Sequence, residues 1–433
     1  MRILVLGGYG LIGTHVVGRL LGDGHELIGL GRDIRQAGIQ TPQVKWIAAD
    51  LGLLTTAAAW GAVLRLADAQ AIVNCAGALQ DGTRDDVGRV QSAAMRALYS
   101  AAPAFAIEQL IQISAPRSNP HGETAFMRSK GAADAALQDS TLDWVILRPG
   151  LVFSPQAYGG TALLRALAAC PWVQPMAYGD RLLQTVCADD VAGAVSEVLS
   201  GRVATRRIYD LVEDKPRSLR EVIGLLRAWL GIPPAPEVII HPTLILAAAR
   251  VADGLGWLGW RSPMRTTAIT ELAAGITGNP AAWRTQTGRP LASLEATLRQ
   301  LPATIQERWY ARAFMLKPVI IAVLSVFWTA TGVVALANPQ SAARVLTSRG
   351  LDDGLALTIV VSGVAMDLIL GLAVISRNSM PWAAKGMIAV TLAYLIGGTL
   401  LTPDLWLDPL GPLVKAIPAL ALAIVALALE GDR

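Results

Sequence analysis

Residues 2–13 read RILVLGGYGLIG, an apolar run that passes directly into a glycine-rich turn. The apolar run is typical of a buried β-strand, and the residues after the turn are typical of a helix. A second apolar run, residues 25–30, predicts another strand. Strand, glycine-rich turn, helix and strand within about 30 residues form the context in which glycines at this spacing bind a dinucleotide. The segment therefore predicts a dinucleotide-binding fold.

Each position of this turn has a physical role in such a fold. Gly7 allows the tight turn, Gly10 allows the backbone to approach a pyrophosphate, and Gly13 allows the helix to pack closely on the sheet. Leu11 and Ile12 lie in the turn just before the expected helix at residues 14–21, whose positive end attracts phosphate. We therefore predict that these five residues bind the cofactor.

The end of the second strand bears on the choice of cofactor. An acidic residue at this point binds the ribose 2′-hydroxyl of NAD, whereas an arginine accommodates the 2′-phosphate of NADP. Arg32 stands at this point, which favours NADP, and Asp33 beside it leaves NAD open.

Strand-like and helical runs continue to alternate along the first part of the chain. Further strands are expected at residues 44–48, 71–75, 110–114, 144–147 and 209–212, with a helix at 85–102 between two of them. This alternation predicts an α/β fold with a doubly wound, Rossmann-type parallel sheet, whose ligands bind at the carboxyl ends of the strands. Asp50, Leu51, Asn74 and Ala76 follow two of these strand ends and are further cofactor candidates, although Asn74 could equally be a turn residue.

The composition limits the classes of function. The 433 residues are 53% hydrophobic and only 16% charged, and the net charge of +4 leaves no basic tract for a nucleic-acid partner. The cysteines are Cys75, Cys170 and Cys187, too scattered for a metal site or a disulfide framework, and they fit a reducing cytoplasm.

The apolar excess is concentrated after Lys317, in four blocks at residues 318–337, 355–375, 382–401 and 410–429. A run of about 20 apolar residues spans the hydrocarbon core of a bilayer as a helix. We therefore expect a Rossmann core at 1–150, a substrate lobe with the remaining Rossmann elements at 151–305, and an all-α four-helix transmembrane domain at 306–433.

The flanking charges predict the orientation of these helices. If the N-terminal part lies in the cytoplasm, the segments on the cytoplasmic side of the four helices hold six basic residues, Arg433 among them. The segments on the outer side then hold only Arg344 and Arg349. The residues before the first glycines are too few for the apolar region of a signal peptide. We expect a multi-pass protein of the cytoplasmic membrane with its N-terminal domain in the cytoplasm.

Several motifs together resemble the extended and atypical short-chain dehydrogenase/reductase superfamily over about residues 1–300. They are the glycine turn, Asp50-Leu51, Gln112-Ile113-Ser114-Ala115, Ser129-Lys130, Arg148-Pro149-Gly150 and the run at 184–192. Within it the chain is most similar to the NmrA-like proteins and the dehydrogenase-like accessory subunit of respiratory complex I. The apolar C-terminal part resembles the DoxX-like membrane domains.

The resemblance implies a catalytic set of serine, tyrosine and lysine. The lysine contacts the ribose and lowers the pKa of the tyrosine, which donates a proton to the carbonyl that the serine holds. Ser114 and Lys130 match this pattern. The position four residues before the lysine, however, is Phe126, which has no exchangeable proton.

This departure leaves three alternatives. His121 or Tyr158 could supply the proton, with His121 the candidate that we carry forward beside Ser114 and Lys130. A quinone could instead take its proton from water. The site could also bind the nucleotide without chemistry, as a sensor or an assembly module at the membrane.

Two features outside this site are also notable. Asp367 interrupts the second apolar block. Lys415 in the fourth block is the expected partner of its carboxylate, and the alternative is a lone protonated aspartate with a lysine that extends to the membrane surface. The apolar residues 244–260 predict either a buried helix of the lobe or an interfacial helix anchored by tryptophan. The sequence as a whole predicts a membrane-anchored, NAD(P)H-dependent oxidoreductase that acts on a small lipophilic acceptor; it leaves the oligomeric state open.

Overall fold

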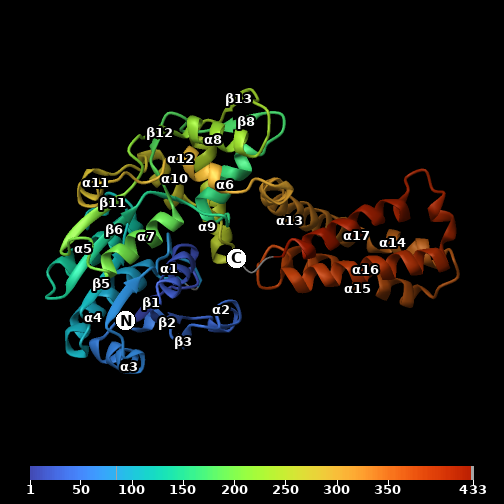
Figure 1. Cartoon of the computed structure of the whole chain (residues 1–433). Helices are drawn as coiled ribbons and strands as arrows, with labels where there is room; N and C mark the ends of the chain where they lie inside the picture. The colour runs from blue at the N-terminus through green and yellow to red at the C-terminus, as the bar shows by residue number, and fades with distance from the viewer. Residues whose placement is uncertain (84, 431–433) are drawn as a thin grey trace. The chain divides into compact units, whose positions relative to one another are not determined.

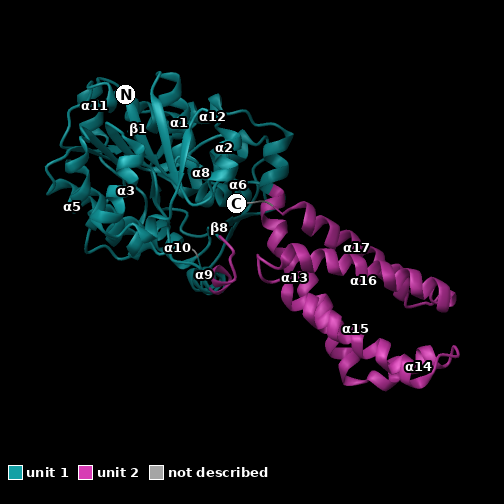
Figure 2. Ribbon diagram, turned by 90° about the horizontal axis from the view of Figure 1, so that it is seen from below, with its two compact units in different colours: residues 1–253, 262–311 teal, residues 254–261, 312–433 magenta. Residues whose placement is uncertain are grey.

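The computed structural model describes residues 1–83 and 85–430. The chain forms two compact units, shown in teal and magenta in Figure 2. Unit 1 comprises Met1–Asp253 and Ser262–Ala311, and unit 2 comprises Gly254–Arg261 and Arg312–Arg433. Arg433, which we counted among the inner flanking charges, lies outside the described residues.

Unit 1 is built on a seven-stranded parallel sheet in the order β11-β6-β5-β4-β1-β2-β3 (Figure 1). The strands are β1 (Arg2–Leu6), β2 (Glu26–Gly31), β3 (Lys45–Ala48), β4 (Ala71–Asn74), β5 (Gln109–Ile113), β6 (Asp143–Pro149) and β11 (Arg207–Leu211). The predicted Rossmann-type sheet is confirmed. Each predicted strand forms within two residues of its expected start, because continuous apolar runs are needed where both faces of a sheet are covered.

Helices cover both faces of this sheet. Leu4 and Leu6 of β1 point to the face covered by α3 (Ala57–Ala67), α4 (Ala94–Ala101) and α5 (Ala125–Gln138). Ile3 and Val5 point to the opposite face, which α1 (Leu11–Gly22), α7 (Ala188–Leu199) and α11 (Ala281–Thr287) cover. The alternation of side chains along β1 thus supplies both hydrophobic cores. The short α2 (Ile34–Gln40) follows β2.

The rest of unit 1 is a lobe of short strands and helices. Its strand pairs are β7 (Leu151–Phe153) with β10 (Thr185–Cys187), β8 (Gln174–Met176) with β13 (Glu237–Ile239), and β9 (Leu182–Leu183) with β12 (Arg217–Ser218). Its helices are α6 (Gly159–Ala168), α8 (Leu219–Trp229), α9 (Pro242–Trp257), α10 (Thr266–Ala274) and α12 (Leu294–Gln300). Phe153, Leu164 and Leu226 belong to its own hydrophobic core.

One expected helix differs from the structure. The predicted helix at 85–102 begins at Val87 and is divided into a π-helical turn, η2 (Arg89–Ala93), the helix α4, and a 3₁₀ turn, η3 (Ala102–Phe105). Asp81 and Asp85 lie before this start, which is two residues later than predicted. The Asp81 carboxylate accepts from the amide of Val87 at 2.8 Å, whereas the Asp85 carboxylate binds Arg32, which follows β2.

Unit 2 is helical. It contains most of α13 (Ile305–Ala337), followed by α14 (Pro339–Thr347), α15 (Asp353–Ala373), α16 (Met380–Leu401), a 3₁₀ turn η4 (Pro403–Trp406) and α17 (Pro412–Ala428). Among the described residues three helices, α13, α15 and α16, are long and apolar enough to cross a membrane. The fourth apolar block forms α17, whose 17 residues are at the lower limit of a membrane span.

The expected partner of Asp367 is wrong. Its carboxylate accepts a hydrogen bond from the Thr331 hydroxyl of α13 at 3.1 Å. Lys415 instead lies exposed near the start of α17. Asp367 and Thr331 belong to neighbouring helices, where Gly332 allows close approach because a Cβ there would lie 2.9 Å from Leu368.

Candidate dinucleotide-binding site

The glycine turn joins β1 to α1 at the carboxyl edge of the sheet. Gly7 has a φ of +68°, which favours glycine, and its amide donates to the carbonyl of Leu30 at 3.1 Å. The amide of Gly10 donates to the carbonyl of Gly7 at 3.0 Å and closes the turn. The sequence therefore places a tight turn directly before the helix.

The three glycines of the motif are required for different reasons. A Cβ at Gly13 would overlap the carbonyl oxygen of Gly7, and one at Gly7 would lie 2.9 Å from the Cα of Ala76. A Cβ at Gly10 would meet only the Gly7 oxygen, at 3.2 Å. Gly7 and Gly13 are therefore needed by the fold itself, whereas Gly10 leaves backbone open to a ligand.

The first turn of α1 fits an anion. Gly10 is its N-cap and offers no side-chain acceptor, so the amides that begin the helix at Leu11 and Ile12 are not capped from that position. No acidic residue lies in this first turn. An uncapped N-terminus beside a close backbone turn suits a diphosphate, so these residues fit the cofactor that the sequence predicts.

Asn74 shapes the neighbouring turn after β4. Its side chain is 1% exposed; its Nδ2 donates to Oε1 of Gln112 at 2.8 Å, and its Oδ1 accepts from the amide of Ala76 at 3.0 Å. Of the two roles considered for Asn74, the geometry favours the turn residue. It holds Ala76 against Gly7, so the loops after β1 and β4 meet at the edge where a cofactor would bind.

Arg32 lies directly after β2, as expected, but its charge is already paired. Its guanidinium lies 2.6 Å from the carboxylate of Asp85, and its amide donates to the Tyr9 hydroxyl at 3.2 Å. Asp50, after β3, accepts from the amide of Gly52 at 2.9 Å, and Leu51 beside it is buried. Arg32, Asp50 and the glycine turn thus follow three adjacent strands.

Two aromatic residues at this edge were not predicted. The ring of Tyr9 covers Gly31 and that of Trp46 covers Gly29, so a Cβ at either glycine would overlap a ring. The two rings contact each other at 5.9 Å between centroids. Gly29 in the predicted strand and Gly31 just after it are a signal of close approach, and they could have indicated these rings.

Lys130 lies beneath the ends of β4 and β5. It is 5% exposed, and its Nζ donates to the carbonyl of Ile113 at 2.9 Å. Burial lowers the pKa of Lys130 to about 8, although the Asp134 carboxylate opposes this shift. A Cβ at Gly77 would lie 3.3 Å from this Nζ, so the lysine reaches the loop after β4. Nearby, burial raises the pKa of Cys75 to about 12, which keeps that thiol protonated.

Ser114 takes part in a buried network that the sequence did not reveal. Its hydroxyl donates to the Asp134 carboxylate at 2.8 Å, and Ser118 donates to the same oxygen at 2.7 Å. The guanidinium of Arg148 completes the network at 2.9 Å. Because Asp134 is only 1% exposed, its charge requires these partners, and the Ser114 proton is engaged there.

The remaining candidates lie at the surface or partly buried. Phe126 is half-buried in the first turn of α5, one helical turn before Lys130. His121 is exposed in the loop before α5, and its amide donates to the Asn119 side chain. Tyr158 is 44% exposed and precedes α6.

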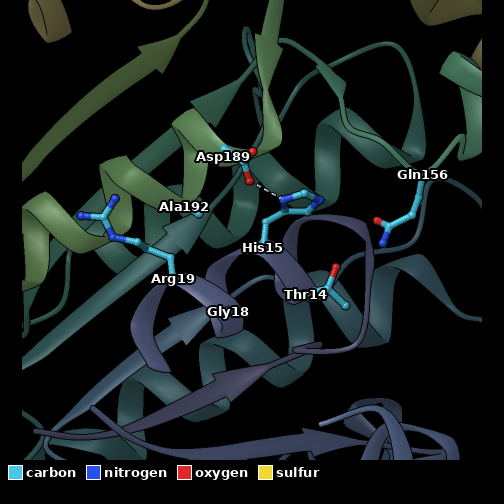
Figure 3. Close-up of a pocket in the computed structure, with 7 residues that line it drawn as sticks. All are labelled: Thr14, His15, Gly18, Arg19, Gln156, Asp189 and Ala192. Carbon is cyan, nitrogen blue, oxygen red and sulfur yellow. Dashed lines mark hydrogen bonds and ion pairs between the residues drawn. The ribbon is translucent and has the colours of Figure 1, made fainter. Parts of the chain in front are cut away.

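A shallow pocket between α1 and α7 is a separate feature. Figure 3 shows His15 and Asp189 pointing toward each other there, with 2.6 Å between ring nitrogen and carboxylate. Its lining residues are Thr14, His15, Gly18, Arg19, Gln156, Asp189 and Ala192. None of them is a predicted site residue, so we attribute the ion pair to packing of α1 on α7. Asp189 and Asp190 both lie in the first turn of α7, which begins at Ala188.

Comparisons with known proteins agree with this geometry. A family model described as NAD(P)H-binding matches residues 7–168, and one described as DoxX-like matches residues 325–424. No curated relative matches the sequence. The chain therefore combines an NAD(P)-binding, Rossmann-type domain with a C-terminal DoxX-like domain of apolar helices.

Similar solved structures support the fold of the first domain. The enzyme WbmG of Bordetella bronchiseptica, in complex with NAD and UDP, is 17% identical with a TM-score of 0.54, over 72% of this chain and 96% of that one. The UDP-glucose 4-epimerase of Thermus thermophilus, in complex with NAD, is 20% identical with a TM-score of 0.52, over 71% and 99%. Unit 1 thus has the same Rossmann-type fold as these NAD-bound structures.

Proposed function

We propose that the protein is a membrane-anchored NAD(P)H-dependent oxidoreductase that reduces a small lipophilic acceptor, such as a quinone, in the cytoplasmic membrane. The observation that carries this proposal is the combination of an open glycine turn with Phe126 in place of an acid. The cofactor would supply a hydride when held by Gly7, Gly10, Gly13 and the first turn of α1. A quinone that accepts this hydride can take its proton from water, so the protein needs no phenol.

The polar groups near the carboxyl edge of the sheet also support reduction of a quinone. The Ser114 proton is engaged by Asp134, so this hydroxyl is not free to hold a ketone oxygen. The Nζ of Lys130 donates to the Ile113 carbonyl next to the loop after β4. From this position the ammonium group could contact the ribose of a bound cofactor. His121 remains a candidate proton donor. Its side chain is exposed, so it could exchange protons with solvent water.

The test is steady-state oxidation of NADPH and NADH by the full chain in lipid nanodiscs. We expect turnover with quinones and little with simple aldehydes and ketones. Tight binding of the dinucleotide without turnover of any acceptor would favour the alternative, a non-catalytic sensor or assembly module. The observation that favours this alternative is that Ser114 and Lys130 are both hydrogen-bonded within the protein.

The preference for NADP over NAD depends on Arg32. Charge-assisted hydrogen bonds to a 2′-phosphate are worth about 1.5–3 kcal/mol, or about ten- to hundredfold in affinity. Arg32→Ala should therefore weaken NADPH binding by this factor and NADH binding little. Asp85→Asn removes the competing carboxylate at 2.6 Å and should strengthen NADPH binding. Fluorescence titration measures both, and an equal loss for the two cofactors in Arg32→Ala would contradict the phosphate role.

The orientation is part of the proposal, with both ends of the chain in the cytoplasm. Arg349, before α15, forms two hydrogen bonds of 2.7 Å with Asp404, after α16. These two helices are thus a hairpin whose open end carries this ion pair, and the connection at residues 374–379 lies at the other end. By the flanking-charge count the ion pair is outside and the connection, with Arg377, is inside.

Topology reporters test this arrangement and the role of α17. A reporter inserted between residues 348 and 351 and another fused to the C-terminus should report opposite sides of the membrane, because α17 returns the chain to the cytoplasm. Reporters on the same side would show that the 17 residues of α17 do not cross. A third reporter at residues 376–378 provides the control, since it must differ from the first in either case.

A further inference from the structure

The helix α9 (Pro242–Trp257) exposes an apolar face. Leu244, Ala247, Ala248 and Val251 follow the i, i+3, i+4, i+7 spacing of one helix face, and all four are exposed. Leu244 is 64% exposed and Val251 is 65% exposed. We call these four residues the outer face of α9. Just before the helix, Ile239 of β13 is 79% exposed and extends the apolar surface.

A second side of α9 is also apolar and packs against the rest of the protein. Ala249 and Ala252 are buried, and Ile245 is partly buried on the same side. Charge is confined to a third side, where Asp253 binds Arg265 at 3.0 Å and Arg250 is exposed. A helix that packs on the protein through one apolar face does not need a second one in water. The outer face therefore requires another apolar partner.

The chain that follows α9 identifies this partner. Residues 254–261 belong to unit 2, where the indole of Trp260 donates to the carbonyl of Ile375 at 2.6 Å. The amide of Arg377 donates to the carbonyl of Leu258 at 3.0 Å. Ile375 and Arg377 lie in the connection between α15 and α16, at the ends of two helices that can cross a membrane. The residues that follow α9 therefore contact the end of a membrane helix pair, where the membrane surface is expected.

We propose that α9 is an interfacial helix whose outer face lies in the boundary between lipid headgroups and acyl chains. The exposed Arg250 can extend its guanidinium to the headgroups while its stem lies along the apolar surface. Such helices carry an apolar face with basic residues beside it and tryptophan near the membrane surface. This docking would hold the lobe of unit 1 at the lipid surface, whichever reaction the domain performs.

Lipid-borne quenching tests the proposal on the full chain. Leu244→Cys and Leu66→Cys are made with Cys75, Cys170 and Cys187 replaced by serine, and each protein is labelled with the same fluorophore. Leu66 is the matched control because it is a 75% exposed leucine on the surface of a helix, α3, of the same unit. The proteins are placed in phosphatidylcholine nanodiscs in which some lipids carry a nitroxide close to the headgroup.

We expect the label at position 244 to be quenched by the nitroxide lipid several times more than the label at 66, and iodide in the water to show the reverse order. Val251→Cys, seven residues away on the same face, should behave as Leu244→Cys does. Equal quenching at 244 and 66 would overturn the proposal. Protection of position 244 from both quenchers would also overturn it, because it would mean that protein, such as a second copy of this chain, covers the outer face.

Discussion

Replacing Gly10 by valine should reduce the affinity for NADPH and NADH by more than about a hundredfold while the protein stays folded. The backbone of Gly10, at φ −76° and ψ 176°, is extended and suits valine. A Cβ there meets only the Gly7 oxygen at 3.2 Å, so a small adjustment of the turn accommodates it. The added methyl groups occupy the space through which a pyrophosphate would approach the helix end. Loss of two charge-assisted hydrogen bonds of about 1.5–3 kcal/mol each accounts for this magnitude.

Two further glycines make the experiment specific. Gly18, on the exposed side of the same helix, has nothing within 4 Å of its Cβ position, so Gly18→Val should leave binding unchanged. Gly13→Ala should instead prevent stable folding, because its Cβ would overlap the Gly7 oxygen and lie 2.8 Å from the Cα of Gly8. Binding is measured by fluorescence titration and folding by thermal unfolding of the full chain in detergent. If Gly10→Val binds both cofactors as tightly as the parent protein, the turn does not hold the pyrophosphate.

The sheet could be predicted from the sequence because its signals are local. Ile3 to Leu6 form an unbroken apolar run, and such runs recur before each polar turn. The glycine turn is also mostly local, since the positive φ of Gly7 and the close contacts of Gly10 and Gly13 arise within the seven residues from Gly7 to Gly13. These features depend on neighbours in the chain, which the sequence displays directly.

The polar contacts of the site could not be predicted, because their partners are distant in the chain. The sequence predicts that Asp85 begins a helix, whereas its side chain pairs with Arg32, 53 residues away. Asp134 lies four residues after Lys130 on the same helix, but only the fold brings Ser114 and Arg148 to its carboxylate. A buried carboxylate must find donors. The sequence shows that it needs them and does not show which residues provide them.

Phe126→Tyr should raise the rate of carbonyl reduction by about a hundredfold, the lower end of the range of 10²–10⁴ for a positioned acid. Residues 126 and 130 are one turn apart on α5, so the new hydroxyl lies on the same side of the helix as Lys130. With a pKa of about 8, Lys130 is mostly protonated at pH 7, where its charge lowers the pKa of a nearby phenol. The gain should therefore be larger at pH 7 than at pH 9. The increase in rate should stay near about a hundredfold because the Ser114 hydroxyl still donates to Asp134 and is not free to hold the carbonyl oxygen.

The measurement is NADPH oxidation by both proteins with a panel of aldehydes, ketones and quinones, and Phe105→Tyr is the control. Phe105 lies in η3, against Arg65 of α3, so the same added hydroxyl there should change nothing. Affinity for NADPH should be nearly unchanged in Phe126→Tyr, since the substitution adds one atom and leaves the glycine turn intact. Rapid ketone reduction by the parent protein would show that another residue, such as His121 or Tyr158, already donates the proton. If instead the parent reduces quinones and only the tyrosine variant reduces ketones, the missing phenol is what restricts this domain to acceptors that need no acid from the protein.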